Sequence, residues 1–303
     1  MFELFYHPIY TYGIDKGSRF PRDRYELTKN KLDTINTNIN FSKPQLAEIE
    51  DLYLGHSKQY VDAFINAKLT EKEKRQIGLQ PWNEYIIERT RYIIGGSIGA
   101  VKSAINRNNI AGNMAGGTHH AHFSYGSGYC IFNDLAICAI KAINEYKNIN
   151  DILIIDLDVH QGDGTASILK NHRNIFTFSM HCEKNFPLKK MRSDLDVPLK
   201  KGLNDKEYLY ILKNNIKILK NIRSDLIFFQ AGVDILSHDT LGYLEISREG
   251  VKKRNEIVLE FAKEKKTPLV VFMGGGYAKP IKHSVDSFTD LFLQCSEYAN
   301  LFN

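Results

Sequence analysis

The chain has 303 residues, of which 43% are hydrophobic and 25% charged, and its formal net charge is +5. This is the composition of a globular protein, and the length suits one large α/β domain or two ordinary ones. Basic residues are spread along the chain and cluster only briefly, at Lys189–Arg192 and Lys263–Lys266, so we expect no direct binding to nucleic acid.

The four cysteines have no CxxC spacing, which argues against a thiolate zinc finger or a disulfide scaffold and fits a reducing, cytoplasmic compartment. The segment Met1–Pro8 has neither the basic nor the apolar region of a signal peptide. No stretch approaches the roughly 18 apolar residues of a membrane span. We therefore expect neither a signal peptide nor a membrane helix.

In the first third of the chain, the longest predicted helix covers Asn83–Asn106, and the polar stretch Thr34–Lys43 and charged stretch Lys68–Gln76 are predicted surface loops. From Ile110 onward, apolar strands alternate with helices. The predicted strands are Ile152–Asp158, Ile175–Met180, Leu226–Ala231 and Leu269–Met273. The predicted helices are Ile131–Tyr146, Gly164–Lys170, Asp205–Ile222, Arg248–Lys265 and Ser284–Tyr298. This order predicts an α/β fold: a single domain over residues 1–303 with an open, mainly parallel β-sheet flanked by helices.

The segment Ile152–Gly164 is the most informative stretch, because its aliphatic run stops abruptly at Asp156, Asp158 and His160. Residues two apart in a strand point the same way, so these three side chains project together. Buried charges need partners, and carboxylate with imidazole suits a divalent metal such as zinc. The sequence thus predicts a metal site at this strand end.

Three further motifs follow apolar stretches and are expected to converge with it at one edge of the sheet: Gly116–His122, Gln230–Asp234 and Met273–Tyr277. Together, Asp158, His160 and Asp234 form a three-ligand set that leaves metal positions open, as in catalytic zinc sites. An imidazole at His119 or His120 can transfer a proton, and the Tyr277 phenol can stabilise an oxyanion.

These motifs resemble those of the zinc-dependent histone deacetylases, within the arginase–deacetylase superfamily, and occur in the same order over about Tyr6–Tyr277. They are Gly-Gly-Thr-His-His-Ala from Gly116, Asp-Leu-Asp-Val-His-Gln-Gly-Asp-Gly from Asp156, Ala-Gly-Val-Asp from Ala231, and Gly-Gly-Gly-Tyr from Gly274. The segments His160–Gly162, His7–Pro8 and Arg19–Pro21 are similar to those of the class IV and related bacterial branch.

The resemblance implies zinc ligands Asp158, His160 and Asp234, with His120 as general base and acid and His119 as its electrostatic companion. It further implies that Asp156 and Asp163 orient the two histidines and that Tyr277 polarises the acyl carbonyl. An acyl-lysine tunnel would be lined by Gly128, Tyr129, Phe186 and Gly275. A potassium ion would lie near the segments that contain Asp156, Asp158, His160, Ser179 and Met180.

The expected activity is removal of an acyl group from the ε-amine of acyl-lysine in proteins or peptides. Two alternatives remain open: an amidohydrolase acting on acetylpolyamine or another small molecule, and a non-catalytic acyl-lysine-binding module. Tyr129 stands where many members have phenylalanine, and Gly78–Trp82 has no counterpart of the aspartate that clamps substrate in class I enzymes. Short acyl chains are expected to be accepted, with a tunnel floor near Tyr6–Arg24 and Gly116–Thr118. The sequence carries no signal of oligomeric state.

The remaining histidines are expected to be hydrogen-bonded core residues, and His122 to lie at the surface or beside the site without binding the metal. The core set is His56, His172, His181, His238 and His283. Cys130 and Cys182 are expected to be packing residues.

Overall fold

The computed structural model describes residues 1–35 and 38–302. Its strands form one eight-stranded sheet in the order β2-β1-β3-β8-β7-β4-β5-β6, and every neighbouring pair is parallel. The strands are β1 Phe2–Phe5, β2 Ile39–Ser42, β3 Ile110–Asn113, β4 Ile152–Asp156, β5 Ile175–Cys182, β6 Leu195–Leu199, β7 Leu226–Gln230 and β8 Leu269–Phe272. The prediction of an open parallel sheet is confirmed.

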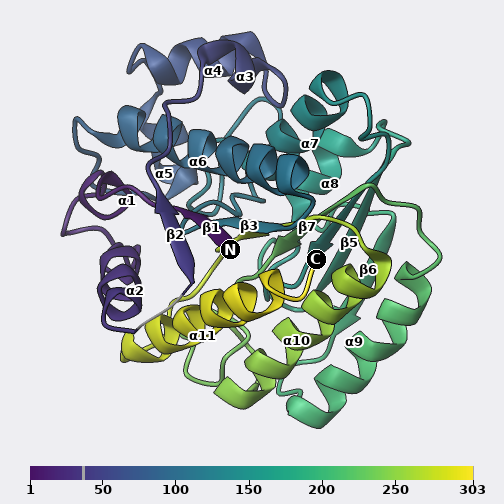
Figure 1. Cartoon of the computed structure of the whole chain (residues 1–303). Coiled ribbons are helices and arrows are strands. Elements are labelled where there is room, and N and C mark those ends of the chain that lie inside the picture. The colour runs from purple at the N-terminus through teal and green to yellow at the C-terminus, as the bar shows by residue number, and fades with distance from the viewer. Residues whose placement is uncertain (36–37, 303) are drawn as a thin grey trace.

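Helices cover both faces of the sheet (Figure 1), with α6, α7 and α8 on one face and α9, α10 and α11 on the other. The helices are α1 Ile9–Tyr12, α2 Arg24–Asp33, α3 Ile49–Tyr53, α4 Lys58–Ile65, α5 Glu71–Ile77, α6 Ile86–Arg107, α7 Asp134–Glu145, α8 Asp163–Leu169, α9 Asp205–Leu219, α10 Arg248–Lys265 and α11 Lys282–Ala299. This two-sided cover explains why the inner strands are apolar at successive positions.

The middle of the sheet is fully buried, and this burial determines where the polar motifs lie. Every residue of β4 and of β7 is buried, including Asp156 and Gln230 at their carboxyl ends. Because parallel strands end at the same edge, the segments after β3, β8, β7 and β4 meet there.

Two predicted loops are wrong. Within Thr34–Lys43, residues 39–42 form β2, which pairs in parallel with β1, while residues 36–37 lie outside the described part. Within Lys68–Gln76, α5 begins after a capping box in which Thr70 and Glu73 bond each other's backbone N–H groups. Both elements bury little apolar surface, so local hydrogen bonds and strand pairing form them rather than a hydrophobic stripe.

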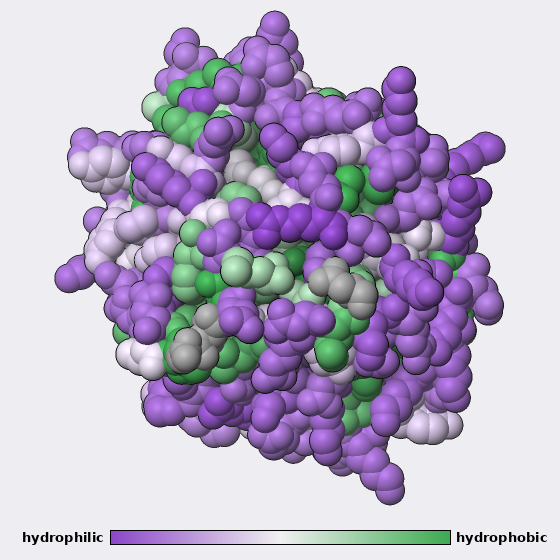
Figure 2. All heavy atoms as spheres, in the orientation of Figure 1, coloured by the Kyte–Doolittle hydropathy of each residue, from purple (hydrophilic) through white to green (hydrophobic). Residues whose placement is uncertain are grey.

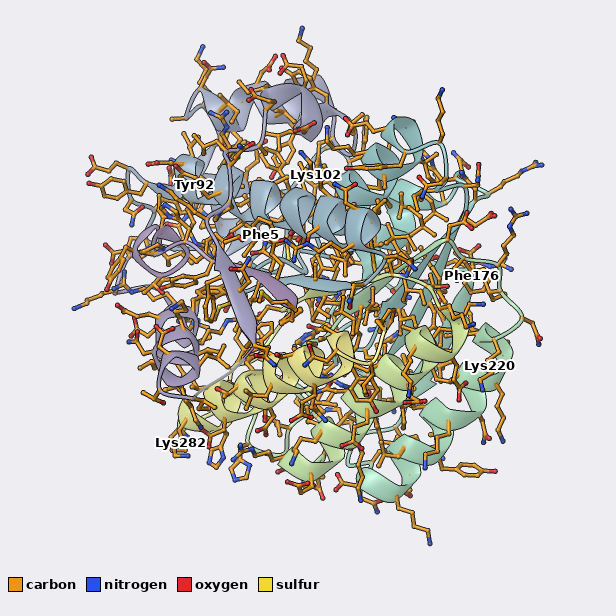
Figure 3. The ribbon with its side chains drawn as sticks, in the orientation of Figure 1. Phe5, Tyr92, Lys102, Phe176, Lys220 and Lys282 are labelled. Carbon is orange, nitrogen blue, oxygen red and sulfur yellow. The ribbon has the colours of Figure 1, made fainter. Side chains whose placement is uncertain are left out.

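The face of the molecule shown in Figure 2 is largely hydrophilic, with smaller hydrophobic areas between. Lys220 and Lys282 lie at opposite margins of the same view (Figure 3) and are exposed. Within residues 1–35 and 38–302, no helix combines the length and hydrophobicity that crossing a membrane requires.

Candidate active site

The four polar motifs meet at the carboxyl edge of the central strands. Asp158 and His160 follow β4, and Asp234 follows β7. The pair His119–His120 follows β3, and Tyr277 follows β8. These four strands are consecutive in the sheet, so segments far apart in the sequence lie side by side, as predicted.

Asp158, His160 and Asp234 form a compact buried cluster. One ligand atom from each can be chosen so that all three lie within 4.8 Å of one another. Nδ1 of His160 lies 3.0 Å from a carboxylate oxygen of Asp158 and 3.3 Å from one of Asp234. Two carboxylates and one imidazole around a shared space can hold a divalent cation.

A second observation supports a cation at this cluster. Oδ2 of Asp234 is buried and makes no hydrogen bond to a described residue, although Nδ1 of His160 lies 3.3 Å away from it. A Cβ atom on Gly275 would lie 2.0 Å from that oxygen and 2.8 Å from Oδ2 of Asp158. Only glycine leaves this space free, and a bound cation would satisfy the oxygen. The residues therefore fit a metal.

The ionisation of the cluster reflects two acids forced together in the interior. Burial and repulsion from Asp158 raise the pKa of Asp234 to about 7. Burial opposes a charged imidazole at His160, but its contacts with Asp158 and Asp234 raise its pKa to about 10. Without a cation, the protonated Nδ1 of His160 thus lies between the two carboxylates, and a bound metal takes the place of that proton.

The adjacent histidines each contact a different carboxylate. Nδ1 of His119 lies 2.7 Å from Asp156, and Nδ1 of His120 lies 2.6 Å from Asp163. Burial opposes protonation of His119, but Asp156 and Asp158 raise its pKa to about 9. Burial and the charge of His119 lower the pKa of His120 to about 4. His120 is therefore the neutral imidazole of the pair, with Nε2 free to accept a proton.

Asp163 also contacts His122, whose Nε2 lies 2.9 Å from its second oxygen. His122 is buried beside the site and is absent from the metal cluster, in agreement with the sequence prediction. His56 and His181 are buried and hydrogen-bonded as predicted.

The prediction of core positions is wrong for the other three histidines. His172 and His283 are half-buried, and His238 is exposed. The rings of His238 and His283 stack on each other at 3.7 Å.

A mouth of about 350 Å³ leads from the surface to the cluster, and His120, His160 and Tyr277 line it. Of the predicted tunnel residues, Gly128, Tyr129 and Phe186 line the mouth, whereas Gly275 lines a smaller adjoining cavity. Their contact with an acyl-lysine stays a prediction. The Phe186 ring meets His120 edge-on at 4.8 Å.

Two residues at the base of the mouth have left-handed backbones. Gly128 has φ of +52°, and a Cβ there would lie 2.7 Å from the His120 ring and 2.9 Å from the Phe186 ring. Tyr129 has φ of +67°, which is unusual for a residue with a side chain and directs its ring toward Tyr277, 5.8 Å away.

An inner cavity of about 40 Å³ adjoins the cluster, with Asp158 and His160 in its lining. Phe20, Arg24 and Gly116–Thr118 line it, in the two segments where the floor was expected. Arg24 is buried and donates to the Gly276 carbonyl at 3.1 Å, next to Tyr277.

These features agree with the comparisons to known proteins. A family model described as the histone deacetylase domain matches residues 18–292. The chain belongs to the histone deacetylase family. An uncharacterized protein of Picosynechococcus is 43% identical over 92% of this chain and 93% of its own length. Histone deacetylase 2 of Arabidopsis thaliana is 31% identical over 78% of this chain, which spans 63% of that protein.

Histone deacetylase clr6 of Schizosaccharomyces pombe is 29% identical over 79% of this chain and 62% of its own length. The solved HDA15 HD domain superposes with a TM-score of 0.82 over 98% of this chain and 89% of that one. Its sequence identity is 18%, so this likeness concerns the fold.

In this histone deacetylase family member, the predicted potassium segments also come together. The register of β4 and β5 places Asp156 opposite Ser179, with Met180 next along β5. The Ser179 hydroxyl lies 3.0 Å from Nδ1 of His181. A potassium ion at this position stays a prediction.

Several residues that position the loops of this site were not predicted from the sequence. The Asp134 carboxylate accepts hydrogen bonds from the N–H groups of Gly117 and Thr118 and so fixes the loop before the two histidines. Asp239 accepts one from the N–H of Tyr277 at 2.6 Å.

A further missed residue is Arg254 of α10, which is fully buried. Its guanidinium donates to the carbonyls of Gly232 at 2.5 Å, Ala231 at 3.1 Å and Leu157 at 3.5 Å. These carbonyls lie in the two segments that carry Asp158 and Asp234, so one side chain ties both together.

Proposed function

We propose that this protein is a zinc-dependent hydrolase that removes an acyl group from the ε-amine of lysine in a protein or peptide. The observation that carries this proposal is the buried Asp158–His160–Asp234 cluster beside two histidine–aspartate pairs at the base of a mouth. Catalytic zinc sites use three protein ligands of this kind and keep a position open.

Asp158, His160 and Asp234 would hold the zinc ion. When bound, zinc acts as a Lewis acid toward the acyl carbonyl and lowers the pKa of water. The mixed oxygen and nitrogen donors favour zinc over calcium or magnesium, which take oxygen ligands alone. Potassium near Asp156, Ser179 and Met180 remains part of this proposal.

The side chains divide the remaining chemistry. His120 is neutral with Nε2 free, so it accepts a proton from the attacking water and returns it to the leaving lysine amine. His119, held as a cation by Asp156 and Asp158, stabilises negative charge nearby. The Tyr277 hydroxyl donates to the acyl oxygen as its charge develops. Asp239 fixes the backbone that presents Tyr277.

The dimensions of the site favour short acyl groups. The inner cavity of about 40 Å³ is only about three times the roughly 10–15 Å³ that one water molecule needs. A long acyl chain would have to displace Phe20 or the buried Arg24.

The composition of the mouth supports an acyl-lysine substrate over an acetylated polyamine. A polyamine is a cation, and its recognition requires carboxylates. The lining residues that the structure describes include none. A non-catalytic binding module is less well supported, because the cluster, His120 and Tyr277 are all present together.

We also propose one catalytic domain over residues 1–303 and a cytoplasmic location. All four cysteines are free and buried, which suits a reducing compartment.

The test is turnover of an acetyl-lysine peptide together with measured zinc content. We expect Asp158→Ala and Asp234→Ala to lose bound zinc and activity together, because each removes a ligand. Asp33→Ala, which alters an exposed aspartate paired with Lys29, serves as the control and should change neither. Unchanged zinc content in both site variants would refute the assignment.

A further inference from the structure

One wall of the mouth carries an excess of positive charge. Residues 183–201 contain six basic and three acidic residues, a net charge of +3, against +5 for the whole chain. We call the six bases the basic rim: Lys184, Lys189, Lys190, Arg192, Lys200 and Lys201. Five are exposed and Lys190 is half-buried.

Contacts place part of the basic rim directly at the mouth. Lys190 donates from Nζ to the carbonyls of Asn185 at 2.6 Å and Pro187 at 2.7 Å, and Asn185 lines the mouth. Nζ of Lys201 lies 3.6 Å from the ring centroid of Tyr243, which also lines the mouth.

The two segments of the basic rim are also joined to each other. The N–H of Glu183 donates to the carbonyl of Leu199 at 2.9 Å, where the paired strands β5 and β6 end. Lys184 and Lys200 are the next residues after this contact on the two segments.

The three acidic residues of this segment, Glu183, Asp194 and Asp196, offset half of the six positive charges and leave a net charge of +3. Within residues 1–35 and 38–302, no carboxylate lies within ion-pair distance of any base in the rim, whereas Lys74 pairs with Glu71 at 2.8 Å. The carboxylates of Asp194 and Asp196 accept hydrogen bonds from neutral groups, Thr177 and Gln161 respectively.

The rest of the mouth does not reverse the sign. The Asp239 carboxylate is engaged by the N–H groups of Tyr277, Leu241 and Gly242. Helix α5, whose Gln76 and Ile77 line the mouth, carries three bases, Lys72, Lys74 and Arg75, against the two acids Glu71 and Glu73. An approaching chain therefore meets a positive field, which attracts negatively charged segments.

We propose that the basic rim selects acyl-lysine segments in which acidic residues flank the acyl-lysine. This rests on the proposed deacylase function and narrows its substrates, since Lys- and Arg-rich segments are repelled. A peptide is favoured over an anionic membrane because the apolar component of the rim is small. Leu188 is 98% exposed at its apex, but Phe186 beside it is 38% exposed and faces the mouth.

The experiment compares acetyl-lysine peptides whose flanking residues are acidic, neutral or basic, with both binding and kcat/KM measured. At low ionic strength we expect the acidic peptide to exceed the basic one by on the order of ten-fold in both quantities. The difference should shrink at high salt, because the screening length falls from about 30 Å at 0.01 M to about 3 Å at 1 M.

Charge reversal supplies the second arm. The triple variant Lys184→Glu, Lys189→Glu, Arg192→Glu should favour the basic peptide. The control triple Lys147→Glu, Lys213→Glu, Lys217→Glu makes the same change in net charge at exposed positions outside the rim and should keep the wild-type order.

The outcomes separate the two proposals. Equal kcat/KM for all three peptides would overturn the selection by the basic rim and leave the deacylase function standing. Selective binding of the acidic peptide without turnover of any peptide would support the basic rim and overturn the deacylase function. Peptide-independent binding to vesicles of anionic lipid or to a nucleic-acid duplex, lost only in the rim variant, would assign the rim to that partner and overturn the peptide proposal.

Discussion

Two neighbouring histidines illustrate how strongly position determines chemistry at the scale of single residues. The rings of His119 and His120 are 4.1 Å apart, yet the pKa of one is raised to about 9 and that of the other lowered to about 4. His119 faces two carboxylates, Asp156 and Asp158, while His120 shares Asp163 with His122. The pair thus separates a fixed positive charge from a proton acceptor.

Tyr277 provides the test of oxyanion stabilisation. We expect Tyr277→Phe to lower kcat on the order of 10²–10³-fold with a much smaller effect on KM, since one donor to the transition state is lost. Peptide kinetics and zinc content are the measurements, and zinc should be retained. The control Tyr210→Phe changes an exposed tyrosine of α9. An unchanged kcat would show that Tyr277 only packs.

At the scale of elements, α10 supports the site from behind the sheet. Val251, Arg254 and Val258 share one buried face of this helix, and Arg254 is fully enclosed. Its cation has backbone carbonyls as partners, together with the side chain of Asn255. Such a side chain holds loops in place through directed hydrogen bonds, which a lysine reproduces only in part.

We expect Arg254→Met to weaken zinc binding by about ten-fold or more, because the loops carrying Asp158 and Asp234 lose their common anchor. Arg254→Lys should recover part of the affinity. The affinity is measured by competition with a chelator, alongside the free energy of unfolding. Lys253→Met alters the exposed neighbour and should have no effect. Equal zinc affinity in Arg254→Met and wild type would contradict this role.

The elements predicted from the sequence are those with a strong hydrophobic signal. Strands β4, β7 and β8 are continuous apolar runs, and their predicted ranges overlap the observed ones. By contrast, all four residues of β2 are half-buried, and α5 buries only Ile77. The T-x-x-E sequence at Thr70–Glu73 was a usable signal for the start of α5.

The site shows the same division between local pattern and tertiary contact. The residues of the four motifs were predicted because their types and spacing are chemically distinctive. Arg254 was not, since it follows Lys252 and Lys253 and resembles one more surface base. Its spacing of three and four residues from Val251 and Val258 places it on the buried face of the helix. Its hydrogen-bond partners, however, depend on how the helix packs against the sheet.

At the scale of the whole molecule, His56 connects two distant segments. Nδ1 of His56 lies 2.9 Å from the carbonyl of His122, and its Nε2 accepts from the N–H of Asn133 at 2.8 Å. Burial lowers the pKa of His56 to about 3. Protonation would set two N–H groups against each other, so the folded protein requires the neutral ring.

This requirement predicts acid sensitivity. The unfolded pKa of histidine is about 6.5, so between about pH 6.5 and 3 the unfolded chain binds the extra proton and folding stability falls as the pH falls. The loss approaches about 1.4 kcal/mol per pH unit. The free energy of unfolding, measured with urea at several pH values, should fall less steeply with decreasing pH in His56→Gln than in wild type. His172→Gln serves as the control and should behave like wild type. Equal slopes in all three proteins would rule out this contribution.

The position of β8 has a consequence for how the protein is made. This strand is the last in the chain, yet it lies between β3 and β7 and pairs with both. A chain emerging from the ribosome therefore carries two groups of strands with facing, unpaired edges until residues 269–272 appear. The same final segment brings Gly275 and Tyr277 to the metal cluster. Translation that stops early would thus release a chain that has open sheet edges and lacks catalytic activity. Chaperones and proteases would bind such a chain.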